Sequence, residues 1–174
     1  MSKLVGSNKA RELAFRVLFS SEQGKHSINQ AWQEAKLDLN HALDDALDPE
    51  TEEGLTEQVS ENLDAEALTF AHRLLLGYDE HRDDVDASLT RVIEGWTFSQ
   101  MSQTDLSILR LASYEILLVD TPPLVAVEIA VRLAKRYGGD DSGRFVNGIL
   151  AKILATEAPL EKRASKGRKG VRKG

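Results

Sequence analysis

The chain has 174 residues, 41% of them apolar, and a chain of this size supports one hydrophobic core. It contains no cysteine, which excludes disulfides, thiolate metal sites and cysteine nucleophiles. No apolar run is long enough for a signal peptide or a membrane helix, so we expect a cytoplasmic protein without a membrane partner.

The net charge of −6 hides an uneven distribution of charged residues. Seven of the 22 basic residues and none of the 28 acidic ones lie in residues 162–174, so residues 1–161 carry a net charge of −13. The segment from Asp38 to Glu66 contains eleven acidic residues and no lysine or arginine. An acidic chain of this kind can still bind nucleic acid if its basic residues gather locally.

The composition, rich in leucine and alanine, favours helices, and apolar residues recur at helical spacing. The first helix is expected to begin near Ser7 or Asn8, either of which can cap it, and to end at Gly24. A second helix fits residues 28 to about 47. The acid-rich segment of about 48–63 is weakly patterned, and we interpret it as an exposed, mobile insert.

Residues 65–76 return to a packed helical pattern, and Gly77 is expected to interrupt it. A charged helix then fits residues 78–93. Ser102 and Asp105 have the spacing of a capping box, in which the serine accepts from the third amide and the acid bonds back to the cap. The helix that follows is the most apolar of the chain, and we expect it to be central.

Pro122 and Pro123 end that helix and start the next one, because proline suits a first turn. The next helix runs to Gly138-Gly139, and Asp140, Asp141 or Ser142 is expected to cap the last one. In total we predict an all-α fold with about seven helices. Residues 7–156 would form a single helical domain, and residues 157–174 a disordered basic tail.

No enzyme signature is present in the sequence. The four histidines do not pair with carboxylates at a metal-binding spacing, and Gly138-Gly139 lacks the sequence of a phosphate-binding loop. We therefore expect a protein that is not an enzyme and that uses no metal and no cofactor.

Nucleic-acid binding is better supported, because Arg144 and Phe145 follow each other in the expected first turn of the last helix. The arginine can meet a phosphate while the aromatic ring stacks on an unpaired base. Phe145 could equally pack in the core one turn before Ile149, and both interpretations remain open. Phe19, near the end of the first helix, presents the same choice.

Polar residues also interrupt the apolar central helix, namely Asp105, Arg110, Tyr114 and Glu115. Asp105 could simply cap the helix, and Arg110 could pack on Tyr114 one turn later. Alternatively, these residues face a protein partner, since arginine and tyrosine are enriched at interface hot spots.

At these residues the chain resembles the NusB family of bacterial transcription antitermination factors. The resemblance is carried by Ala10-Arg11-Glu12-Leu13-Ala14, by residues 105–115, by Pro122-Pro123 and by the specific phrase Ser142-Gly143-Arg144-Phe145-Val146-Asn147-Gly148. It spans most of the chain.

The resemblance implies two small helical bundles that bind boxA RNA together with NusE, a small-subunit ribosomal protein. With NusA and NusG, such a complex helps RNA polymerase read through terminators, notably in ribosomal RNA operons. The positions that match the family's RNA surface are Arg11, Phe19, Asp141, Arg144 and Phe145. The nearby cation Lys9 is added to this predicted RNA-binding set. Those matching its partner surface are Asp105, Arg110, Tyr114 and Glu115.

The sequence departs from the family pattern near its N-terminus, where one cation, Lys9, stands in place of an arginine run. We hypothesise that the basic tail supplies the missing charge. Two other functions remain possible: a helical protein-binding scaffold, or the RNA-binding front end of an RNA methyltransferase if the chain is a fragment. A homodimer is also possible.

Overall fold

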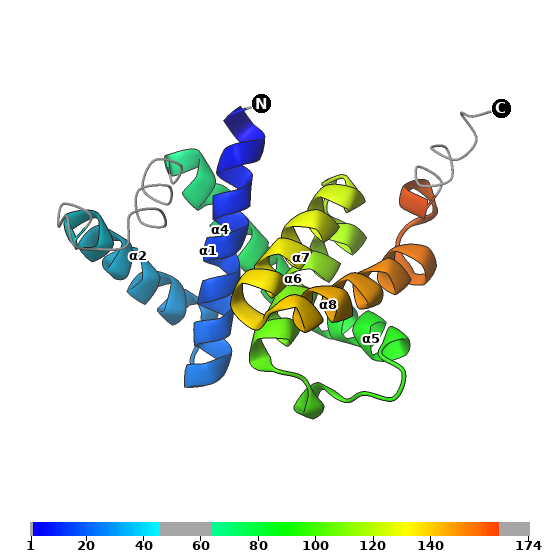
Figure 1. Ribbon diagram of the computed structural model, residues 1–174. Helices are drawn as coiled ribbons and strands as arrows, with labels where there is room; N and C mark the ends of the chain where they lie inside the picture. Colours follow the sequence, from blue (N-terminus) through cyan, green and yellow to red (C-terminus); the bar gives the residue numbers. More distant parts are fainter. Residues whose placement is uncertain (1, 46–63, 164–174) are drawn as a thin grey trace. The chain divides into compact units, whose positions relative to one another are not determined.

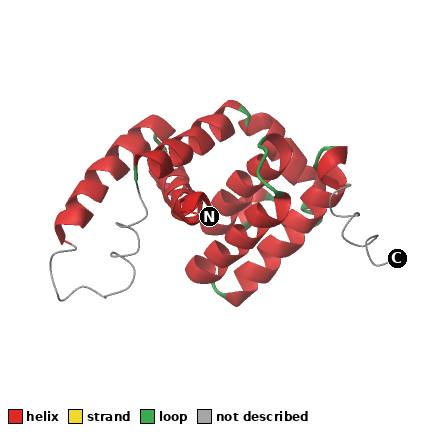
Figure 2. Ribbon diagram, turned by 90° about the horizontal axis from the view of Figure 1, so that it is seen from above, coloured by secondary structure: helices red, strands yellow, loops and turns green. Residues whose placement is uncertain are grey.

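The computed structural model describes residues 2–45 and 64–163. Seven α-helices lie in these ranges: α1 (Ser2–Gly24), α2 (Ile28–Asp45), α4 (Ala65–Glu80), α5 (Arg82–Val92), α6 (Gln103–Leu118), α7 (Pro123–Gly138) and α8 (Asp140–Lys152). A short 3-10 helix, η1 (Phe98–Gln100), and a π-helical segment, η2 (Ile153–Glu157), complete them. Within the described ranges Figure 2 shows helices and loops and no strand, which confirms the all-α fold.

No helix in the described ranges is both long enough and apolar enough to cross a membrane. The predicted acidic insert at 48–63 lies outside the described residues, and so does the part of the basic tail from 164 onwards.

The chain divides into two compact units, Met1–Asp79 and Glu80–Gly174. This division agrees with the two helical bundles that the family resemblance implied. The sequence pattern alone had predicted one domain, because it could not show which helices share a core.

In the first unit, α1 packs on α2 (Figure 1). The apolar stripe predicted for the first helix is buried as expected: Ala10, Leu13, Ala14, Val17 and Leu18. The ring of Trp32 on α2 stacks on the ring of His72 on α4, with centroids 4.7 Å apart and planes 5° apart. This contact joins α2 to α4, so the three helices described in this unit are linked to one another.

Two helix boundaries in the first unit differ from the prediction. The first helix begins at Ser2, so neither Ser7 nor Asn8 caps it. Helix α4 continues through Gly77 to Glu80, and Tyr78, expected to open the next helix, is fully buried near its end. A single glycine costs a helix only about 1 kcal/mol, and the burial of Tyr78 outweighs that cost.

The second unit is built around α6, which packs against α5, α7, α8 and η2 (Figure 1). Helix α6 is therefore central, as its apolar sequence predicted. Ser102 caps it, since the hydroxyl accepts from the amide of Asp105 at 3.1 Å. The predicted return bond from the Asp105 carboxylate is replaced by a contact with α8, described below.

The turn between α7 and α8 depends on two glycines. Gly139 has φ +94° and ψ −178°, a conformation that side-chain-bearing residues rarely adopt. At Gly138 a Cβ atom would lie 2.3 Å from the Ser142 hydroxyl oxygen, so only glycine admits this close approach. The two glycines let α8 fold back on α7. Of the neighbours of α8, α7 is the one with which it packs most extensively.

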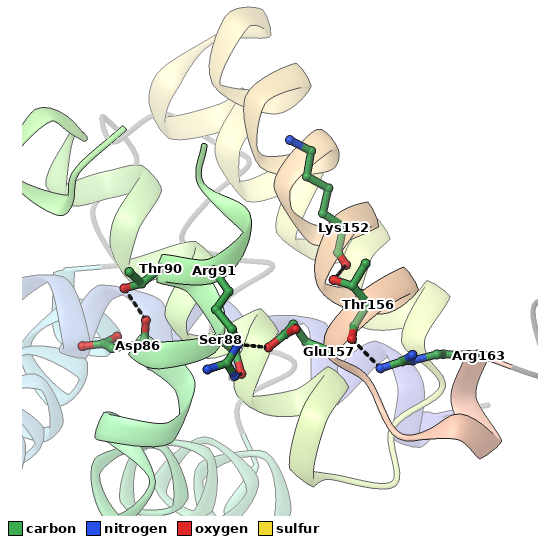
Figure 3. Close-up of polar contacts among 8 residues, drawn as sticks. All are labelled: Asp86, Ser88, Thr90, Arg91, Lys152, Thr156, Glu157 and Arg163. Carbon is green, nitrogen blue, oxygen red and sulfur yellow. Dashed lines mark hydrogen bonds and ion pairs between the residues drawn. The ribbon is translucent and has the colours of Figure 1, made fainter. Parts of the chain in front are cut away.

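The predicted disordered tail begins too early, because residues 157–163 are folded against the second unit. Glu157 pairs with Arg91 of α5 at 2.5 Å, and the Arg163 side chain donates to the carbonyl of Thr156 (Figure 3). Arg163 also donates to the carbonyl of Ala158 at 2.6 Å. The ammonium of Lys162 donates to three carbonyls at the end of α6, those of Glu115, Ile116 and Val119. Composition alone could not separate these residues from the Lys/Gly-rich sequence that follows.

Candidate RNA-binding and partner-binding surfaces

Helix α8 begins one residue earlier than its sequence suggested. Its N-cap is Gly139, no side chain caps it, and Asp140 and Asp141 occupy the first turn. The prediction that Asp140, Asp141 or Ser142 caps the helix is therefore wrong. Arg144 and Phe145 consequently lie in the second turn, beyond the free amides that would bind a phosphate.

Arg144 projects from α8 with 73% of its side chain exposed, and its guanidinium donates to the carboxylate of Asp141. Asp141 is itself almost fully exposed. An ion pair this exposed is worth little, roughly 0–1 kcal/mol, so a phosphate can replace the carboxylate at small cost. Arg144 is thus a positive charge available to an anionic ligand.

Phe145 is half-buried, and its ring lies against Trp96, with centroids 5.6 Å apart and planes tilted by 58°. Trp96 comes from the segment between α5 and η1 and is 50% exposed. Phe145 is thus neither fully buried in the core nor a free ring. It belongs to a two-ring cluster that we call the aromatic pair, Trp96 and Phe145.

The predicted RNA-binding residues of α1 lie in the first unit and differ in exposure. Arg11 is only 7% exposed, and its guanidinium lies over the ring of Phe70, 4.9 Å from the centroid. A phosphate therefore cannot meet Arg11 without displacing it. Lys9 is partly exposed and lies 3.9 Å from Glu12, while Phe19 is half-buried beside Phe15.

The polar residues of α6 are mostly buried inside the second unit. Asp105 is 9% exposed, and its Oδ2 accepts from the Ser142 hydroxyl at 3.4 Å. Its Oδ1 is buried and has no hydrogen-bond partner among the described residues. A buried carboxylate oxygen without a hydrogen bond is unfavourable, so a hydrogen bond from any donor that can reach it would be favourable.

Arg110 is held inside the second unit by residues outside its own helix. Its guanidinium forms two hydrogen bonds with Asp86 of α5, at 3.0 and 3.1 Å, and lies 5.3 Å from the centroid of the Phe98 ring. These contacts tie α6 to α5 and η1, which is a structural role.

Tyr114 and Glu115 differ sharply in exposure. Glu115 is 2% exposed, whereas Tyr114 is half-buried and lies beside the ring of His81 with centroids 6.0 Å apart. Burial raises the pKa of the Tyr114 hydroxyl above its usual value, and the carboxylates of Glu80 and Glu115 raise it further. Tyr114 is therefore the most accessible of the four predicted partner-binding residues.

Sequence reasoning missed three residues that shape these surfaces. Trp96 is absent from the predicted sites, although a tryptophan beside glycine in a loop is a signal for exposure. Asp86 resembles any other acid on the charged face of α5. Lys162 stands within the low-complexity tail, and nothing in its local sequence marks it as a cap for α6.

The fold and these surfaces together define a small all-helical protein of two units, with an exposed arginine and an aromatic pair on the second. The chain belongs to the NusB family, whose model matches residues 8–155. It is 45% identical over 153 residues to the transcription antitermination protein NusB of Thermus thermophilus, covering 88% of this chain and 93% of that one.

Solved structures share the fold. The structure of NusB from T. maritima is 30% identical, covers 91% of this chain and 96% of its own, and has a TM-score of 0.69. A structure described as antitermination factors NusB and NusE in complex with dsRNA has a TM-score of 0.67 and covers 85% of this chain and 95% of its own. At 19% identity, that second likeness shows the fold alone.

Proposed function

We propose that this chain is a transcription antitermination factor. It binds boxA-type single-stranded RNA together with the ribosomal protein NusE and promotes read-through by RNA polymerase in ribosomal RNA operons. Membership of the NusB family supports this function. The observation that carries it is Arg144, exposed on α8 directly before Phe145 and inside the sequence phrase most specific to the family.

Within this proposal, the residues of the second unit contact RNA directly. Arg144 meets a phosphate, Phe145 contributes a ring to an unpaired base, and Asp141 orients Arg144 and offers an oxygen to a base edge. In the first unit, Lys9 and Phe19 contribute a cation and a ring. Arg11 supports that surface from beneath, because it is packed on Phe70.

NusE contacts the second unit through α6, and Tyr114 is the residue that meets it most directly. The buried Oδ1 of Asp105, which has no hydrogen-bond partner among the described residues, accepts a hydrogen bond from NusE only if the side chains that cover it move. Arg110 and Glu115 contribute by holding α6 in place from buried positions. Replacing Tyr114 by alanine should weaken NusE binding, measured by calorimetry, while Tyr137→Ala on α7, another exposed aromatic, should not.

Fluorescence anisotropy with labelled boxA RNA, with and without NusE, tests the RNA-binding function. Arg144→Gln should weaken binding and flatten the plot of log affinity against log salt by about 0.7, the slope contributed by one phosphate on a single strand. A scrambled RNA should bind less tightly than boxA.

Arg132→Gln is the matched control for that substitution. Arg132 on α7 is also exposed and ion-paired within its helix, to Glu128 at 2.7 Å. It should leave affinity and salt slope unchanged. If wild-type protein binds boxA neither alone nor with NusE, the proposed function is wrong and a protein-binding scaffold is favoured.

A further inference from the structure

The aromatic pair brings together two rings that are 49 positions apart in the sequence, Trp96 before η1 and Phe145 in α8. Their planes are tilted by 58°, so the rings do not stack on each other and do not cover each other's faces fully. Half of the Trp96 surface remains exposed. Leaving so large an apolar ring in water is unfavourable, and a ligand that covers it gains that free energy.

The backbone holds Trp96 in place. The Trp96 amide donates to the Ile93 carbonyl at 3.0 Å, and the next amide, that of Thr97, donates to the Gln100 side chain at 2.9 Å. Gly95, with φ +79°, makes the turn that precedes the ring. A ring held by a fixed turn loses little conformational freedom when a ligand stacks on it, which favours binding.

The charge that directly precedes Phe145 in α8 indicates which ligand fits. Arg144 adjoins Phe145 in the sequence and exposes 73% of its side chain. A flat ring next to a cation matches a nucleotide, which joins a flat base to an anionic phosphate. A purely apolar protein segment would make no use of the positive charge of this guanidinium.

We propose that Trp96 and Phe145 form one stacking site for an unpaired RNA base, in which Trp96 supplies the larger surface. This inference rests on the proposed RNA-binding function and assigns a residue that the sequence analysis did not select. The neighbouring Arg144 binds the phosphate of the same or the adjacent nucleotide. Duplex RNA, whose bases are already stacked and paired, binds this site less well.

The first experiment compares Trp96→Ala, Trp96→Leu and Trp96→Phe in anisotropy titrations with single-stranded boxA RNA. Alanine and leucine should each weaken binding roughly 10-fold to 100-fold, and phenylalanine less, because only phenylalanine keeps a flat ring. The salt slope should stay unchanged in all three, which distinguishes lost stacking from a lost phosphate contact. Leu118→Ala, which removes another half-exposed apolar side chain of the same unit, should bind as wild type.

The second experiment uses Trp96 as its own reporter. The other tryptophan, Trp32, is buried in the first unit, so the difference between wild-type and Trp96→Phe fluorescence isolates Trp96. Single-stranded RNA should quench this signal, and a boxA duplex should quench it less. Thermal melts followed by circular dichroism should show that every variant is folded at the temperature of the titrations, since half of the Trp96 side chain is exposed.

Three outcomes would overturn the inference. If boxA RNA binds wild type and Trp96→Ala equally and does not quench Trp96, the stacking site is wrong while the RNA-binding function stands. If only NusE changes the Trp96 signal, the pair belongs to the protein interface. If wild type binds no RNA with or without NusE, the inference and the proposed function both fall.

Discussion

The charged residues that interrupt the apolar helices of this protein are mostly not surface residues. Arg11 lies on Phe70, Arg110 lies between Asp86 and Phe98, and Glu115 is almost completely buried. Each is surrounded by the folded chain, and a buried charge of this kind needs its partner. Arg11 and Arg110 therefore first hold helices together, through Phe70 on α4 and Asp86 on α5.

Replacing Arg110 by methionine should destabilise the protein by about 2–4 kcal/mol, because it leaves the Asp86 carboxylate without its two hydrogen bonds. Chemical denaturation measures this change. Arg132→Met, which removes an exposed ion pair, should cost less than about 0.5 kcal/mol. Equal effects of the two substitutions would contradict a structural role for Arg110.

Tyr114 should make stability depend on pH in the alkaline range. Its pKa is raised in the folded state, so the unfolded chain releases this proton first, near the usual value of 10.0. Stability contributed by the neutral hydroxyl is full below that pH and is lost as pH rises through the folded pKa. Urea unfolding of wild type and Tyr114→Phe from about pH 9 to 11 should show wild type losing stability relative to the variant. If the unfolding free energies of wild type and variant change in parallel with pH, Tyr114 does not contribute this pH dependence.

At the scale of elements, the turn between α7 and α8 positions the start of α8. Gly139 supplies a backbone conformation reserved for glycine, and Gly138 leaves room for Ser142 to contact Asp105 on α6. The start of α8, which carries Arg144, is thus held at α6 because Gly138 and Gly139 have no side chains.

Gly139→Ala should destabilise the protein by about 1–3 kcal/mol, since φ +94° is strained for any residue with a side chain. Gly148→Ala provides the opposite case, because it lies within α8 with open space around it. That substitution should stabilise the protein by about 0.5–1 kcal/mol. Thermal unfolding of both variants checks the prediction, and a neutral Gly139→Ala would show that the turn is not strained.

For the whole molecule, we expect the basic C-terminal sequence to serve two purposes that divide near residue 163. Lys162 caps the end of α6, which has no basic residue in its own last turn. Burial lowers the pKa of Lys162 below its usual value, although the carboxylates of Asp120, Glu115 and Glu161 oppose this shift. For the five basic residues after 163, the hypothesis is that they add positive charge for RNA binding.

Two truncations separate these roles. Removing residues 164–174 should leave stability unchanged and flatten the salt dependence of RNA binding, because it removes cations that neutralise phosphates. Removing residues 160–174 should also cost about 1–3 kcal/mol of stability, since the carbonyls at the end of α6 lose Lys162. An unchanged salt slope after the shorter truncation would refute the hypothesis that the tail replaces the missing N-terminal arginines.

The sequence by itself determined the helical class, the central position of α6, the starts of α2 and α7, and the phrase around Arg144 that marks the family. Those features depend on spacing within one segment, which apolar periodicity and proline or glycine report directly. Only the tertiary structure decided that Arg11, Arg110 and Glu115 are buried and that Trp96 meets Phe145. The physical reason is that burial and ring contacts depend on which neighbours the fold brings to a side chain, and residues far apart in sequence carry no local sign of meeting.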